Sequence, residues 1–190
     1  MIGNPPPEAH PNLGGAVRHC VVCGAPLERR VWAFDGTEQL CCTRPGCTYV
    51  HFLDPKVAAG VIPTFGGKTI LLQRAHNPGK GLWTFPGGYV NQGEVVQKAA
   101  AREALEEAAV EVRVGALLGV YSFDRFPTIL IVFAGEVVSG EPRAAAESTA
   151  LRLVGAEEIP FGDLAFDTTR AAMRDWQEWM RTGRVSGTAL

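Results

Sequence analysis

The 190-residue sequence lacks long hydrophobic runs and carries almost no net charge. Its longest apolar stretches, such as residues 128–134, are far shorter than the ~20 residues that span a bilayer, which argues against a membrane helix. The formal net charge of −2 argues against a nucleic-acid binder that relies on a broad basic field. Residues 1–15 are polar and proline-rich, without the apolar segment of a secretory signal. We therefore expect a cytoplasmic protein with neither a membrane nor a nucleic acid as partner.

Cysteine is absent after Cys47, and all five cysteines lie within residues 20–47. Cys20 and Cys23 form a C-x-x-C-G knuckle, and Cys42 and Cys47 flank a Pro-Gly turn. In a reducing compartment such pairs favour a tetrahedral zinc site over disulfides. Four ligands leave no open position for catalysis, so the zinc would be structural and would stabilise a small unit. Cys41 is the odd thiol, although a small register shift would let it replace Cys42.

Composition and hydrophobic periodicity divide the chain into four parts. We expect a flexible tail at 1–17, a zinc ribbon at 18–56, a larger domain at 57–182 and a C-terminal tail at 183–190. In the larger domain, strands are predicted at 57–63, 69–73, 112–120, 129–138 and 151–154, with a short apolar piece at 83–85. Helices are predicted at 95–108 and 167–181.

Each predicted helix has one apolar face. In the first, Ala101, Leu105 and Ala108 are expected to pack against the sheet. In the second, helical spacing predicts that Met173, Trp176 and Met180 are buried.

The opposite face of the first helix carries three carboxylates. Glu103, Glu106 and Glu107 stand at i, i+3 and i+4, and therefore share about 100° of arc. Carboxylates this close repel one another unless solvent or a cation compensates them. Hard oxygen ligands favour Mg²⁺ or Mn²⁺. Arg102 is placed to pair with Glu94 or to hold one of the ligand carboxylates.

These residues belong to a longer spaced pattern that starts at Gly88. Residues 88–110 resemble the Nudix box, G-x5-E-x7-R-E-U-x-E-E-x-G-U, in which U is a bulky apolar residue, over 23 residues. Two positions depart from it. Ala104 occupies the first apolar position, and Ala109 stands where the family has glycine. If that position needs a positive φ, alanine costs about 1 kcal/mol there.

The resemblance extends on both sides of the box. Residues 83–88 (Trp-Thr-Phe-Pro-Gly-Gly) and 71–74 (Leu-Leu-Gln-Arg) look like the family's approach to it. The arrangement of an N-terminal zinc ribbon before the larger domain is similar to that of a Nudix subgroup that hydrolyses dinucleotide-type pyrophosphates. Residues 147–161 and 164–166 resemble its FAD and ADP-ribose pyrophosphatases, whereas residues 121–127 lack the signature of its NADH branch.

The resemblance implies an α/β (α+β) fold, a Nudix α/β/α sandwich with a mixed sheet, preceded by the zinc ribbon. It implies a Mg²⁺- or Mn²⁺-dependent pyrophosphohydrolase that splits ADP-ribose, FAD or a similar nucleoside diphosphate derivative into two monophosphates. A house-cleaning (d)NTP pyrophosphohydrolase and a nucleotide- or RNA-sensing module are the alternatives, and a homodimer is one possible assembly.

The same resemblance assigns roles to individual residues. The expected metal ligands are Glu103, Glu106 and Glu107, with Arg102 beside them in the catalytic set. The general base is one of these glutamates or Glu147 from a later loop. The residues expected to bind substrate are Arg74, Gly88 and Glu94.

Overall fold

The computed structural model describes residues 17–31, 36–52, 54–124, 126–145 and 147–185. The chain divides into two compact units, residues 1–55 and 56–190. The tails expected at 1–17 and 183–190 lie outside the described residues except for residues 17 and 183–185. No helix in the described part of the chain is long and apolar enough to cross a membrane.

The N-terminal unit is a small antiparallel sheet. Its three strands, β1 (Leu27–Val31), β2 (Glu38–Cys42) and β3 (Val50–His51), lie in the order β1-β2-β3. Among its described residues, only Cys20, Cys41 and Cys42 are buried. Hydrophobic burial this limited cannot offset the conformational entropy of ordering the unit.

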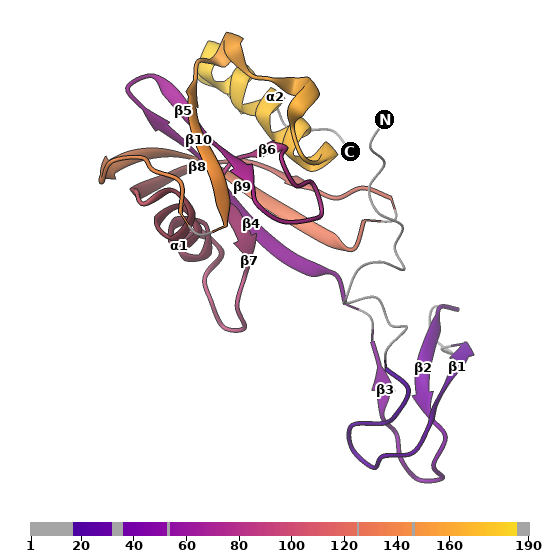
Figure 1. Cartoon of the computed structure of the whole chain (residues 1–190). Helices are drawn as coiled ribbons and strands as arrows, with labels where there is room; N and C mark the ends of the chain where they lie inside the picture. The colour runs from indigo at the N-terminus through magenta and orange to yellow at the C-terminus, as the bar shows by residue number, and fades with distance from the viewer. Residues whose placement is uncertain (1–16, 32–35, 53, 125, 146, 186–190) are drawn as a thin grey trace. The chain divides into compact units, whose positions relative to one another are not determined.

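The C-terminal unit is built on a seven-stranded mixed sheet (Figure 1). Its long strands are β4 (Lys56–Phe65), β5 (Lys68–Arg74), β8 (Glu111–Tyr121), β9 (Thr128–Ser139) and β10 (Ser148–Val154), in the order β10-β5-β4-β9-β8. Strands β4 and β9 are parallel, and the other neighbours are antiparallel. Two short strands complete the sheet: β6 (Trp83–Thr84) pairs with β5, and β7 (Gly87–Tyr89) pairs with β4.

Two helices cover opposite faces of this sheet (Figure 1): α1 (Val96–Ala108) and α2 (Asp167–Thr182). Two short 3₁₀ turns, Ala156–Glu158 and Phe161–Asp163, precede α2. Successive strand residues point to opposite faces, so Ile70 and Leu72 pack on the α1 side and Leu71 packs on the α2 side. The predicted α/β/α sandwich with a mixed sheet is confirmed.

Part of the predicted helix packing is wrong. Leu105 is 51% exposed and Met180 is 39% exposed, although both were expected to pack inward. The buried stripe of α1 consists of alanines: Ala99, Ala100, Ala104 and Ala108. Leu105 and Ala101 each follow a residue of this stripe and lie about 100° around the helix from it, so neither is fully buried. Ala104, which replaces the family's bulky residue, is therefore central to the contact.

Strand β7 was not predicted, because glycine is depleted in strands. It forms because the chain passes too close to β4 for any side chain. A Cβ on Gly87 would lie 2.9 Å from the Cα of Gly60 and 3.0 Å from the carbonyl oxygen of Ala59. Gly87 thus lets this segment pair closely with β4, and Gly88 lies against the Glu103 side chain of α1.

Candidate functional site

Four cysteines of the N-terminal unit gather at one point. The sulphur atoms of Cys20 and Cys47 are 3.8 Å apart, those of Cys23 and Cys42 are 3.4 Å apart, and all four lie within 4.8 Å of one another. With Zn–S bonds of about 2.3 Å, a tetrahedral site has its sulphurs about 3.8 Å apart. The backbone N–H of Ala25 is the main cause that lowers the pKa of Cys23 to about 7, whereas burial raises the pKa of its neighbour Cys42 to about 12.

The neighbouring thiol of Cys41 is not in this group. Adjacent residues on β2 point to opposite faces, so Cys42 faces the other cysteines while the Sγ of Cys41 approaches the carbonyl of Gln39 at 3.8 Å. The structure therefore selects Cys42 over Cys41 as the fourth member of the cluster. Within the described residues, this is the only group of three or more His, Cys, Asp or Glu side chains with ligand atoms gathered so closely.

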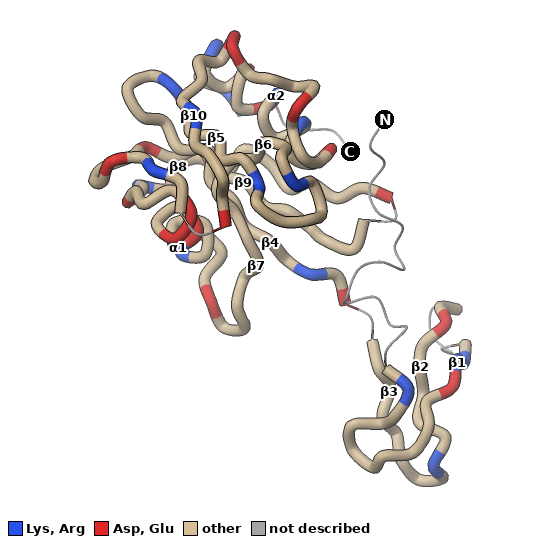
Figure 2. Tube along the Cα trace, in the orientation of Figure 1, with Lys and Arg blue, Asp and Glu red and all other residues tan. Residues whose placement is uncertain are grey.

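Several acidic residues of the C-terminal unit, red in Figure 2, occur along α1. They are organised around the guanidinium of Arg102, as the sequence predicted. Arg102 donates to Glu94 at 2.8 Å and 3.1 Å, to Glu103 at 2.7 Å and to Glu106 at 2.9 Å. A further bond reaches the carbonyl of Tyr89 at 3.1 Å. The bonds between Arg102 and Glu94 are the main cause that lowers the pKa of Glu94 to about 2. The ion pair of Glu94 with Arg102 therefore persists under acidic conditions.

The three glutamates of α1 differ in their exposure. The side chain of Glu103 is only 12% exposed, whereas that of Glu106 is 56% exposed. Glu103 lies against the backbone of Gly88, where a Cβ would stand 2.4 Å from its carboxylate oxygen. Gly88 therefore makes room for a carboxylate. Burial raises the pKa of Glu103 even though Arg102 contacts it.

Glu107 is the most unusual of these carboxylates. It accepts a hydrogen bond of 3.0 Å from the backbone N–H of Gly87, which joins α1 to β7. Burial, with smaller contributions from Glu103 and Glu147, nevertheless raises the pKa of Glu107 to about 7. The protein thus holds negative charge here that its own donors compensate only in part.

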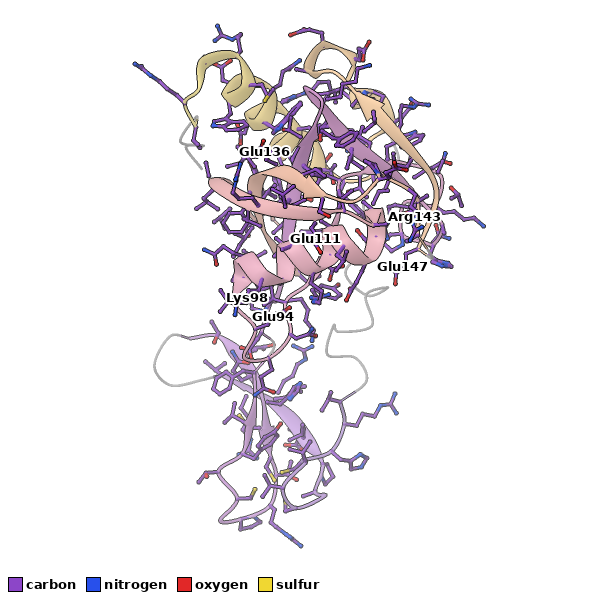
Figure 3. All side chains as sticks on the ribbon, turned by 90° about the vertical axis from the view of Figure 1, so that its left-hand side faces the viewer. Glu94, Lys98, Glu111, Glu136, Arg143 and Glu147 are labelled. Carbon is purple, nitrogen blue, oxygen red and sulfur yellow. The ribbon has the colours of Figure 1, made fainter. Side chains whose placement is uncertain are left out.

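Glu147 comes from the loop that joins β9 to β10, and Figure 3 shows it with Arg143 at the C-terminal end of α1. Main-chain hydrogen bonds attach this loop to the helix: Arg143 N–H donates to the carbonyl of Ala108 at 3.0 Å, and Ala145 N–H to that of Glu107 at 3.1 Å. They satisfy two of the free carbonyls at the helix end. The exposed carboxylate of Glu147 is near enough to raise the pKa of both Glu103 and Glu107.

Arg74, at the end of β5, lies near the charges of Glu107 and Glu147. Its Nε donates to the carbonyl of Pro78 at 2.8 Å, and its guanidinium lies 5.1 Å from the centre of the Phe166 ring. Burial lowers the pKa of Arg74, and the nearby charges of Glu107 and Glu147 oppose that change. The terminal amino groups of Arg74 form no hydrogen bond with the described residues, so they remain available for an anion.

The departure at Ala109 has a backbone consequence. Ala109 follows α1 with φ 57° and is the one non-glycine residue with positive φ among those that the structure describes. Its N–H closes the helix on the carbonyl of Leu105 at 3.1 Å. The family's glycine would be free of the strain that alanine bears here.

Sequence reasoning missed the residues that support the site from other elements. Phe166 supports Arg74, and Gln73 is joined to Thr149 by a hydrogen bond across 76 positions of the chain. Gln73 and Phe166 both lie in segments that resemble the family, at 71–74 and 164–166, but only their spatial contacts reveal these supporting roles.

Comparison with known proteins gives the family. A NUDIX domain profile matches residues 54–180. An ADP-ribose pyrophosphatase from Methanocaldococcus jannaschii is 37% identical over 135 residues, which are 69% of this chain and 78% of that protein. A NAD-capped RNA hydrolase (NudC) from Stutzerimonas stutzeri is 27% identical over 125 residues, 65% of this chain but 42% of that protein.

Among solved structures, a NUDIX hydrolase from Nitrosomonas europaea superposes with a TM-score of 0.82 at 31% identity. The match covers 90% of this chain and 96% of that one, so it extends beyond residues 56–190 into the N-terminal unit. The domain profile, the M. jannaschii relative and the superposed structure all agree with the resemblance of residues 88–110 to the Nudix box. The chain belongs to the Nudix family of pyrophosphohydrolases.

Proposed function

We propose that the protein cleaves the diphosphate of a nucleoside diphosphate joined to another moiety, with ADP-ribose or FAD as the substrate class, and releases two monophosphates. The observation that carries the proposal is the set of incompletely compensated carboxylates around Glu107, with the half-buried Arg74 beside them. The named activity of the M. jannaschii relative supports ADP-ribose.

Nudix hydrolases use divalent metals, and the donor set of this chain fits them. Glu103, Glu106 and Glu107 offer hard oxygen ligands of the kind that Mg²⁺ and Mn²⁺ prefer. Burial is the main cause that raises the pKa of Glu103 and of Glu107, and a cation bound beside them would favour their ionised forms. A bound divalent ion neutralises the diphosphate and makes water more acidic.

The chain's own groups supply the remaining steps. Arg102 holds Glu103 and Glu106 in place through its two hydrogen bonds. Arg74 binds a phosphate oxygen through its terminal amino groups. Glu147, or one of the α1 glutamates, accepts the proton of the attacking water. Gly88 and Glu94 act indirectly, since one makes room for Glu103 and the other orients Arg102.

We propose a separate, structural role for the cysteine cluster. Cys20, Cys23, Cys42 and Cys47 bind one zinc ion, which stabilises a unit with few buried side chains. Four sulphur ligands leave that ion no open position for a substrate.

Product analysis over a substrate panel tests the proposed reaction. ADP-ribose, FAD, NADH, diadenosine polyphosphates and dNTPs are each incubated with Mg²⁺ or Mn²⁺, and the products are identified by chromatography. We expect AMP with ribose 5-phosphate from ADP-ribose, or AMP with FMN from FAD. Preferred cleavage of dNTPs to a nucleoside monophosphate and pyrophosphate would favour the house-cleaning activity. Release of orthophosphate would contradict the reaction class.

A further inference from the structure

The position of the loop that carries Glu147 depends on backbone hydrogen bonds and not on the Glu147 side chain. Within the described residues, no hydrogen bond or ion pair holds the Glu147 carboxylate. Its backbone is held instead, since Ala75 N–H donates to the Glu147 carbonyl at 3.1 Å and Ser148 N–H donates to the Ala145 carbonyl at 2.8 Å. Its charge is near enough to raise the pKa of Glu103 and of Glu107, so these like charges repel one another.

Directly after Glu147, strand β10 has an irregular register. Ser148 is opposite Arg74 and Ala150 is opposite Gln73, so Thr149 is the extra residue of a β-bulge. Its Oγ1 donates to the Oε1 of Gln73 at 2.8 Å and approaches the Gln73 carbonyl at 3.4 Å. A side-chain bond thus replaces the regular pairing at the position where the strand turns toward the site.

Gln73 continues this connection to the loop on the other side of Arg74. Its Nε2 donates to the carbonyl of Gly81 at 2.9 Å, and Gly81 N–H donates to the carbonyl of Arg74 at 2.9 Å. The amide of Gln73 therefore joins three segments: the start of β10, the end of β5 and the loop before β6. These segments carry or flank Glu147 and Arg74.

We propose that Thr149, through its hydrogen bond to Gln73, is a positioning residue that holds the bulge and thereby the Glu147 carboxylate beside the α1 glutamates. The inference rests on the proposed role of Glu147. A misplacement of about 1 Å is enough to lower turnover by one to two orders of magnitude when the displaced group acts in the reaction.

Steady-state kinetics with ADP-ribose and saturating Mg²⁺ test this on the full-length protein. Thr149→Val keeps the shape and the β propensity but removes the donor, and we expect kcat to fall about tenfold with KM within about twofold of wild type. Thr149→Ser retains the donor and should restore kcat to within about threefold. Gln73→Met breaks the same bond from the β5 side and should reproduce the Thr149→Val effect. Thr182→Val, which removes a 2.8 Å hydroxyl bond at the end of α2, is the matched control and should leave kcat unchanged.

A double-mutant cycle separates positioning from a general structural role. If Thr149 acts through Glu147, then Thr149→Val has no further effect on kcat in a Glu147→Gln background. Additive losses, equal losses in Thr149→Val and Thr149→Ser, or wild-type kcat in Thr149→Val would each overturn the inference. Wild-type kcat in Glu147→Gln alone would also overturn it, while the proposed reaction would still stand on the products that the enzyme releases.

Discussion

The cysteine cluster and the α1 carboxylates differ in how completely the protein assembles them. Four sulphur atoms lie within 4.8 Å of one another in a unit where, among described residues, only cysteines are buried. The carboxylates of α1 lie on a large two-layered core but are spread from the nearly buried Glu103 to the exposed Glu106. Arg102 and the Gly87 amide already occupy part of their oxygen atoms.

This difference indicates two kinds of metal use. A unit without an apolar core depends on its ligands for stability, so the zinc that we propose for it would be part of the fold. A helix that is already packed against a sheet does not need a cation in order to fold. Its carboxylates can bind and release ions together with a polyanionic substrate. We therefore expect metal binding to be required for folding at the cysteine cluster but not at the α1 carboxylates.

Replacing one cysteine of the cluster should have the largest effect. Cys42→Ser removes one of four ligands, so we expect zinc content to fall from about one equivalent to nearly none and the N-terminal unit to lose its structure. Elemental analysis gives the zinc content, and the amide resonances of the unit report its folding. Cys41→Ser is the matched control, because Cys41 is adjacent and buried but outside the cluster. Equal zinc loss in both variants would contradict the selection of Cys42.

Neutralising Glu107 should stabilise the protein in the absence of divalent ions. The folded-state pKa of about 7 exceeds the ordinary value of 4.5, so ionisation of Glu107 destabilises the fold as pH rises through this range. At pH 8 without Mg²⁺, we expect Glu107→Gln to raise the free energy of unfolding by up to about 3 kcal/mol. The gain should vanish by about pH 3.5, a unit below the ordinary value of 4.5, where the wild-type side chain is largely neutral in both states.

Denaturant unfolding at the two pH values measures this effect. Glu157→Gln, at an exposed glutamate before α2, is the control and should change neither value. A Glu107→Gln protein that is less stable than wild type at pH 8 without Mg²⁺ would mean that the chain itself compensates this charge.

Adding one methyl group to Gly88 should impair turnover more than folding. The new Cβ would stand 2.4 Å from an oxygen of Glu103, whose flexible end can move aside. We expect Gly88→Ala to lower kcat about tenfold or more through displacement of this carboxylate, with Tm within a few degrees of wild type. Unchanged kcat would show that the exact position of Glu103 is unimportant.

Restoring the family residue after α1 should have the smallest effect. Ala109→Gly relieves the positive φ of 57°, and we expect a gain of about 0.5–1 kcal/mol, because the greater entropy of unfolded glycine offsets part of the relief. Thermal and denaturant unfolding measure the gain, and kcat should remain unchanged. Loss of stability would indicate that the methyl group of Ala109 makes a contact that outweighs the strain.

Local patterns in the sequence predicted much of this structure. Strand alternation and helical spacing indicated the main elements, and the spacing of Gly88, Glu94 and Arg102 indicated the family. The ion pair of Arg102 with Glu94 was also predicted, because one helix and its preceding loop contain both residues.

What could not be predicted depends on close approach between distant segments. The exposure of Leu105 follows from which residues of α1 form the buried alanine stripe, which periodicity alone does not show. Strand β7 forms because of a contact with Gly60, and the bond between Gln73 and Thr149 arises from a bulge in the pairing of two strands. Such features depend on tertiary packing, which overrides local propensity.

Hydrolysis of ADP-ribose by Glu107→Gln at saturating Mg²⁺ tests whether the α1 carboxylates support the proposed reaction. The carboxylate of Glu107 is largely buried and accepts a hydrogen bond from the Gly87 amide, so we expect it to be the most important ligand of the proposed divalent cation. We expect wild-type protein to release AMP and ribose 5-phosphate, and Glu107→Gln to retain its fold but lose nearly all turnover. Near-wild-type turnover by Glu107→Gln would contradict the proposed role of Glu107 as a ligand of the divalent cation.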